Sequence, residues 1–220
     1  MRRIANFFNC GTPNKFYKVI FSFEYLTMQP SPIVYVSRIT NLSDARYCAG
    51  MGAELLGYVI DPSHPDYVSP ENYQQMVGWI SGPARVLEIV SDESIDMAAA
   101  QKQYAPDYFH IPSRLLRLYA QSPVPLIVDI SIEEFTSMTN GGDKFENISH
   151  WIITGVPQDS EQFPVANLPV LIQWSDYSIP ATRLLEITGA SGICLKGSHE
   201  TAPGLKDYDH LSQVLEELNG

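Results

Sequence analysis

The chain has 220 residues, of which 45% are hydrophobic, and this is enough for one domain with a substantial core. Its formal net charge of −11, from 14 Lys and Arg against 25 Asp and Glu, argues against nucleic acid as a partner, because such binding depends on cations that neutralise phosphates. The three cysteines are odd in number and lack a C-x-x-C spacing, so they indicate neither disulfides nor a metal site and fit a cytoplasmic location. No apolar run approaches the roughly 20 residues of a membrane span.

Residues 1–30 show no pattern that specifies their structure, and we treat them as an amino-terminal extension ahead of a domain over residues 31–220. In that domain, short runs rich in β-branched residues alternate with amphipathic stretches, which is typical of repeated βα units. The expected strands are residues 33–36, 55–60, 85–90, 107–111, 124–129, 150–154, 169–173 and 192–196. The expected helices begin near residue 41 and at residue 70, and then cover residues 94–103, 113–120, 132–138, 180–189 and 207–218.

Helix start signals support this division of the chain. Asn41 or Ser43 can cap the first helix, and Ser69 followed by Pro70 is a good start for the second, because a short polar side chain accepts hydrogen bonds from free amides of the first turn. Residues 157–164 show no helical period, so we expect the sixth helix to be short or missing. Eight strands with interleaved helices predict an α/β fold, a single (β/α)8 TIM barrel.

Several spaced blocks of residues occur in a familiar order. They are Ile39-Thr40 with Asp44-Ala45, then Tyr67-Val-Ser-Pro-Glu71, and finally Glu200, Pro203, Gly204, Lys206 and Asp207. Through these blocks the chain resembles the phosphoribosylanthranilate isomerase family over residues 33–218. The resemblance implies a barrel enzyme of tryptophan biosynthesis, an intramolecular oxidoreductase-type isomerase that acts on a phosphorylated sugar derivative. The sequence indicates no cofactor.

The positions that carry this family's proton transfers are substituted. In the family the first strand ends in Lys-Ile-Cys-Gly-Ile-Thr, whose cysteine is the general base, and Ser37 stands at the matching place here. The family's general acid is an aspartate that ends the sixth strand, where this chain has Thr154. A serine hydroxyl without assistance stays protonated near pH 7, and a threonine cannot donate a proton as a carboxylic acid does.

The ligand-binding positions also differ from the family. Asp66 replaces an arginine that holds the substrate carboxylate, and Gln173-Trp174 replaces a glycine pair that lets backbone amides approach an anion. In the loop after the last strand, Lys196 and the amides of Gly197, Ser198 and His199 are candidates for binding an anion. Arg38 replaces a glycine of the family. Its side chain could pair with an acidic ligand, or bridge to Asp61 or Asp66 and fill the pocket.

Asp129 ends the fifth expected strand and could replace the lost acid, with His110 or His199 as a base that titrates near pH 7. The alternatives are that Asp129 begins the next loop or caps its helix, and that His110 is buried between strand and helix and paired to a backbone carbonyl.

The favoured hypothesis is a barrel that has lost the family's Amadori rearrangement and binds a small anionic or phosphorylated metabolite or a partner. The second is a working isomerase whose acid and base have moved to other strand ends. The third is an interaction protein that uses Trp174, Tyr58 or the aromatic arm within residues 7–26, including contacts between identical chains.

Overall fold

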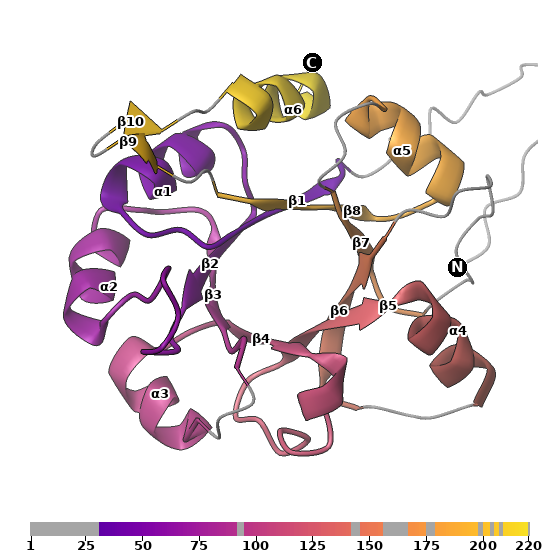
Figure 1. Cartoon of the computed structure of the whole chain (residues 1–220), viewed down its shortest axis with the longest axis horizontal. Coiled ribbons are helices and arrows are strands. Elements are labelled where there is room, and N and C mark those ends of the chain that lie inside the picture. Colours follow the sequence, from indigo (N-terminus) through magenta and orange to yellow (C-terminus); the bar gives the residue numbers. More distant parts are fainter. Residues whose placement is uncertain are drawn as a thin grey trace, which may run out of the picture. The chain divides into compact units, whose positions relative to one another are not determined.

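Eight parallel strands close into a barrel in which each strand pairs with its sequence neighbours and β8 pairs with β1 (Figure 1). The structure is a computed structural model that describes residues 31–91, 95–141, 146–155, 167–174, 179–197, 200–202, 205–206 and 209–219. The predicted extension at residues 1–30 and the segment at residues 157–164, where a short or missing helix was expected, lie outside this part of the chain.

The strands confirm the predicted TIM barrel and lie within two residues of the expected bounds. They are β1 Ile33–Ser37, β2 Leu55–Val59, β3 Ala84–Glu88, β4 Tyr108–Pro112, β5 Leu126–Ser131, β6 Ile148–Thr154, β7 Val170–Gln173 and β8 Gly192–Lys196. A short antiparallel hairpin that the sequence did not predict follows β8, formed by β9 Glu200–Ala202 and β10 Leu205–Lys206.

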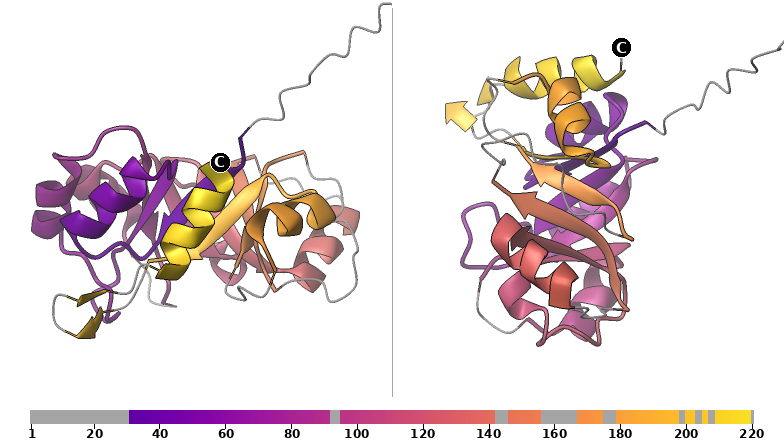
Figure 2. Two further views of the ribbon diagram at one scale, coloured as in Figure 1. Left: turned by 90° about the horizontal axis from the view of Figure 1, so that it is seen from above. Right: turned by 90° about the vertical axis from the view of Figure 1, so that its right-hand side faces the viewer.

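The helices lie outside the ring of strands, and α5 and α6 are neighbours there (Figures 1 and 2). They are α1 Leu42–Gly50, α2 Pro70–Val77, α3 Met97–Tyr104, α4 Ile132–Gly141, α5 Ala181–Thr188 and α6 Asp209–Asn219. Two of the caps are the predicted ones: Asn41 accepts from the Asp44 amide at 3.0 Å, and Ser69 accepts from the Asn72 amide at 3.3 Å ahead of Pro70.

The α-helix expected at residues 113–120 does not form. The structure has only one short 3-10 helix there, η1 Ser113–Leu115, followed by turns through residue 121. Leu115, Leu116 and Tyr119 are all buried, because successive turns direct the same side chains inward as a helix would. The apolar spacing therefore specified burial correctly, although it did not specify the hydrogen bonds.

Successive side chains of each strand point to opposite faces, and this divides the hydrophobic core into two parts. Side chains that point outward, such as Val34 and Val36 of β1, pack against the helices. Side chains that point inward form a second cluster inside the barrel, made of Tyr35, Leu55, Val86, Ile127, Ile152, Leu171 and Cys194. This inner cluster closes the barrel below its mouth, and the next inward residue of each strand reaches the open end.

Candidate functional site

A cavity of about 170 Å³ lies at the carboxyl ends of the strands, the end of a TIM barrel where active sites are found. Its polar lining comes from six of the eight strands and from residues directly after β1 and β4. The polar and charged residues of this lining, here called the mouth, are Ser37, Arg38, Glu88, His110, Arg114, Asp129, Gln173, Cys194 and Lys196.

The two positions expected to carry the family chemistry hold hydroxyls that make hydrogen bonds within the protein. Ser37 ends β1, is buried and lines the mouth, where it shares a hydrogen bond with the Cys194 thiol. Thr154 ends β6, and its hydroxyl donates to the Ile130 carbonyl at 3.3 Å. Burial, followed by the nearby Glu88 carboxyl, raises the pKa of the Cys194 thiol well above its usual value, so this thiol stays protonated.

Glu88, at the end of β3, is a candidate functional residue that the sequence analysis did not identify. Its side chain is 2% exposed, and its Oε1 accepts a hydrogen bond from the Arg38 amide at 2.8 Å. Burial raises the pKa of Glu88 to about 7, although the Arg38 amide, the Arg38 charge and the Tyr35 hydroxyl act in the opposite direction. A carboxyl with this pKa exchanges its proton near pH 7, which suits general acid or base work.

The sequence did contain a signal for Glu88. It is a single acidic residue in an otherwise apolar strand, and alternation places it on the same face as Val86, which points into the barrel.

His110 lines the mouth from β4, and its pKa is shifted away from the expected value near 7. Burial, followed by the Arg38 charge, lowers the pKa of His110 to about 4, so the imidazole is neutral. Its Nδ1 lies 3.1 Å from the Tyr35 hydroxyl oxygen, and the two rings meet edge to face. His110 is therefore neither packed between strand and helix nor paired to a carbonyl.

Asp129 lies within β5 and faces the mouth, so it neither begins a loop nor caps the next helix. Ser131 supplies the oxygen that accepts from the Glu134 amide in the first turn of α4. Burial raises the pKa of Asp129, while Lys196, Arg114 and Arg38 partly oppose the shift. The buried Oδ1 of Asp129 has no hydrogen-bond partner among the described residues, which leaves an acceptor for a donor on a ligand.

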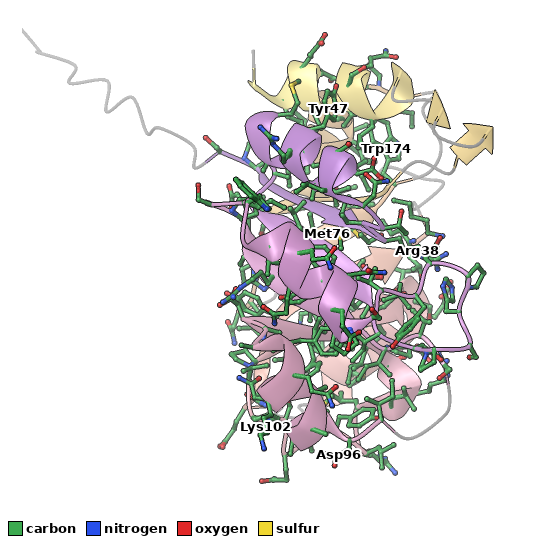
Figure 3. All side chains as sticks on the ribbon, turned by 90° about the vertical axis from the view of Figure 1, so that its left-hand side faces the viewer. Arg38, Tyr47, Met76, Asp96, Lys102 and Trp174 are labelled. Atoms are coloured by element: carbon green, nitrogen blue, oxygen red, sulfur yellow. The ribbon has the colours of Figure 1, made fainter. Side chains whose placement is uncertain are left out.

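Three cations surround the mouth. Lys196 ends β8 with an exposed side chain, Arg114 reaches it from η1, and Arg38 follows β1. Arg38 bridges to Asp66 at 3.7 Å, one of the alternatives expected for it, and Figure 3 shows it beside the loop that holds Asp66. Arg114 was not expected from the sequence, and it donates to the Val90 carbonyl at 3.1 Å.

The other expected ligand-binding residues separate into three groups. Gln173 lines the mouth at the end of β7, whereas Trp174 is 4% exposed and belongs to the core between strands and helices. The Gly197 amide donates to the Ser37 carbonyl at 2.7 Å, so this amide is not available to hold an anion. Ser198 and His199 lie outside the described residues.

The sequence analysis also suggested Trp174, Tyr58 and the aromatic arm as contacts with a partner. Trp174 and Tyr58 are too buried to form a surface contact, so that role is wrong for both, and the aromatic arm lies outside the described residues. Across the described ranges, no cluster of His, Cys, Asp and Glu side chains is arranged to hold a metal ion. In the same part of the chain, no helix is long and apolar enough to cross a bilayer.

Comparisons with known proteins identify sequence relatives of one kind, while no family model matches the chain. The N-(5'-phosphoribosyl)anthranilate isomerase of Sinorhizobium fredii is 21% identical over 183 residues, which cover 73% of this chain and 81% of that protein. The protein of the same name from Rhizobium meliloti is 20% identical over 189 residues, which cover 76% and 88%.

Solved structures agree on the fold. The phosphoribosylanthranilate isomerase of Thermotoga maritima superimposes with a TM-score of 0.65 at 17% identity, over 86% of this chain and 99% of that chain. The enzyme from Thermus thermophilus gives a TM-score of 0.65 at 18% identity, over 85% and 98%. A further isomerase structure, in complex with reduced 1-(o-carboxyphenylamino)-1-deoxyribulose 5-phosphate, gives 0.66 at 17% identity, over 86% and 99%. The chain therefore has the barrel fold of these structures and is similar in sequence to two phosphoribosylanthranilate isomerases.

Proposed function

We propose that this chain binds a small anionic, phosphorylated metabolite at the mouth of its barrel and has lost the Amadori rearrangement that its family relationship implies. The observation that carries the proposal is a contrast between the charges of the mouth and the two positions that the resemblance assigns to proton transfer. Arg38, Arg114 and Lys196 surround the mouth, whereas the base and acid positions of the family hold only the hydroxyls of Ser37 and Thr154.

The charges of the mouth favour an anion. His110 is neutral, and the pKa of Glu88, raised to about 7, reduces the negative charge of that carboxyl near pH 7. Lys196, Arg114 and Arg38, which also bridges to Asp66, supply positive charge at the mouth, which suits a phosphate dianion. The bound phosphate compound of a related isomerase structure is consistent with this choice of ligand.

The size of the cavity limits the ligand. An apolar cavity of about 150 Å³ takes up benzene, so the 170 Å³ bounded by the described residues has room for a fragment of similar size, such as a phosphate group with a few carbon atoms. The unpartnered Oδ1 of Asp129 favours a ligand that also carries a hydroxyl or amine donor.

Titration calorimetry with inorganic phosphate tests the anion site. Binding should weaken by about tenfold or more in Lys196→Ala, because the side chain supplies a charge-assisted hydrogen bond. Lys102→Ala is the matched control, since Lys102 is an exposed lysine in the last turn of α3, away from Arg38 in Figure 3. Equal affinities in the two variants would remove the mouth as the binding site.

A second candidate function is a working phosphoribosylanthranilate isomerase, or a related sugar-phosphate isomerase of tryptophan biosynthesis, with relocated acid and base. The presence of two carboxyls, Glu88 and Asp129, in the same mouth favours it. A fluorescence assay with phosphoribosylanthranilate separates the two candidates. We expect no turnover above the rate without enzyme, and turnover that disappears in Asp129→Ala would establish the second candidate instead.

A further inference from the structure

The Tyr35 hydroxyl lies between two titratable groups inside the barrel. On one side it shares a hydrogen bond with the Glu88 carboxyl, and on the other its oxygen lies 3.1 Å from Nδ1 of His110. Burial, followed by the charge of Glu88, raises the pKa of Tyr35 far above its usual value, so this hydroxyl keeps its proton. Tyr35 therefore has one proton to donate and two neighbours that can receive it.

Because the Tyr35 hydroxyl has one proton for two acceptors, the hydrogen bonds that connect Glu88, Tyr35 and His110 can be arranged in two ways. When Glu88 is ionised, Tyr35 donates to the carboxylate and accepts from Nδ1–H of His110, which leaves Nε2 without a proton. When Glu88 is protonated, it can donate to Tyr35, Tyr35 donates to Nδ1, and the imidazole proton is on Nε2. The protonation state of Glu88 thus selects the tautomer of a neutral His110.

The second nitrogen of His110 is the open end of this chain. His110 lines the mouth, and its Nε2 has no hydrogen-bond partner within the described ranges. The low pKa of His110 keeps the ring from holding two protons at pH 7. When Nε2 receives a proton, Nδ1 must therefore release its own proton, and Tyr35 is the neighbour that receives it.

We propose that Glu88, Tyr35 and His110 form a proton relay that connects the buried Glu88 carboxyl to a ligand bound in the mouth. A hydroxyl, an amine or an acidic C–H group of the ligand gives its proton to Nε2 of His110. The Nδ1 proton passes to the Tyr35 oxygen, and the Tyr35 proton passes to Glu88. One proton enters and none is lost, so the negative charge moves from Glu88 to the ligand. The inference rests on the proposed function for the presence of an anionic, proton-bearing ligand.

The surrounding charges suit this transfer. The developing charge on the ligand arises beside Arg38, Arg114 and Lys196, which stabilise it. Glu88 accepts a proton readily because of its burial, and the groups that act on it are the Arg38 amide and charge, the Tyr35 hydroxyl and the Asp66 carboxylate. Glu88 in turn acts on the Cys194 thiol, which stays protonated and does not compete for the proton.

The experiment is a ¹⁵N NMR titration of the histidine side chains in the ligand-free protein from about pH 5.5 to 8.5, where each ring nitrogen reports whether it carries a proton. In the wild type, Nε2 of His110 should change from protonated to unprotonated as the pH rises through about 7, the pKa of Glu88, while the ring stays neutral. Tyr35→Phe and Glu88→Gln should both remove this change. If Tyr35→Phe does not fold, Glu88→Gln alone decides.

Tyr108 and His150 provide the matched control. Their rings also meet edge to face, at 5.7 Å between centroids, but Nδ1 of His150 contacts Ser149 and not the tyrosine hydroxyl. Tyr108→Phe should leave the change at His110 intact. One fixed His110 tautomer across the whole range in the wild type, or a change that survives in Tyr35→Phe, would overturn the relay.

Adding saturating inorganic phosphate separates this inference from the proposed function. A bound anion near Glu88 disfavours the carboxylate, so the midpoint of the His110 change should move to higher pH. If the change occurs as described but phosphate does not move it, the relay is supported and the anion site is wrong.

Discussion

The carboxyl group of Glu88 occupies the space that a side chain at Gly57 would fill. The two residues lie on neighbouring strands, β3 and β2, and both point into the barrel. A Cβ atom built at Gly57 would collide with Oε1 of Glu88 and with the Tyr35 hydroxyl. The glycine on β2 therefore gives the buried acid its position on β3, and it keeps the acid and the tyrosine together.

Gly57→Ala should destabilise the protein by about 1–3 kcal/mol, because the added methyl group overpacks the barrel interior. Glu88→Ala should reduce this cost when the two changes are combined, since the main obstacle is then removed. Chemical denaturation of the single and double variants measures both effects.

Gly50→Ala is the control for that experiment. A Cβ at Gly50, the last residue of α1, meets nothing within 4 Å, so the change should be neutral or stabilise by up to about 1 kcal/mol. Equal effects at residues 50 and 57 would show that the space beside Glu88 is not tightly filled.

The stability of the protein should depend on pH through Glu88. Its pKa rises from 4.5 in the unfolded chain to about 7 in the fold, so the folded state holds the extra proton between these values. This contribution is fully present below about pH 4.5 and is lost as the pH rises through 7, with a total of about 3 kcal/mol. Glu88→Gln removes it, so the variant should gain stability over the wild type by up to that amount above pH 7.

The titration of His110 changes the stability in the opposite direction. The pKa of His110 falls to about 4 in the fold, so its contribution to stability is lost as the pH decreases from 6.5 towards 4. In the wild type this loss hides the pH dependence that Glu88 causes. The difference between wild type and Glu88→Gln cancels the His110 term, and denaturant midpoints at several pH values measure it. The exposed change Glu54→Gln should give a difference that does not vary over this range. A similarly flat difference for Glu88→Gln would contradict the assignment.

The barrel itself was predictable because runs of β-branched residues and helix caps are local signals. Asn41 and Ser69 cap the helices at which the sequence placed them, since a cap depends on residues one turn apart. The site was less predictable because its distances join residues far apart in the chain. The contact of Tyr35 with His110 crosses the barrel interior and requires strands β1 and β4 to be in a particular register.

The missed Glu88 illustrates a second reason. The resemblance pointed to residues 37 and 154, and both hold hydroxyls. Asp129 on β5 was a candidate acid from the sequence, whereas Glu88 on β3 was not. Alternation alone could have placed residue 88 inside the barrel, but its raised pKa depends on burial by several strands, which only the closed structure supplies.

Asp129→Asn should strengthen the binding of inorganic phosphate by about 3- to 10-fold, because it removes a negative charge from the mouth and leaves the shape almost unchanged. Glu54→Gln changes the net charge of the protein equally, but residue 54 precedes β2 at the opposite end of the strands. Calorimetry at several salt concentrations measures both variants. An equal gain in Glu54→Gln would mean that the net charge of the whole protein, and not the mouth, controls binding.

Arg38→Gly separates backbone strain from ligand binding. Arg38 has a φ of 59°, in the left-handed region that costs a non-glycine residue about 1 kcal/mol, and Ala105 shares this conformation with a φ of 49°. Glycine at either position should relieve the strain, although Arg38→Gly also loses the contact with Asp66.

Ala105→Gly should therefore stabilise the protein by about 1 kcal/mol and leave phosphate affinity unchanged. Arg38→Gly should change stability little and weaken phosphate binding by about tenfold, because only this variant removes a cation from the mouth. Denaturation and calorimetry on the same two proteins test both parts, and undiminished phosphate binding in Arg38→Gly would show that Arg38 serves Asp66 and not the ligand.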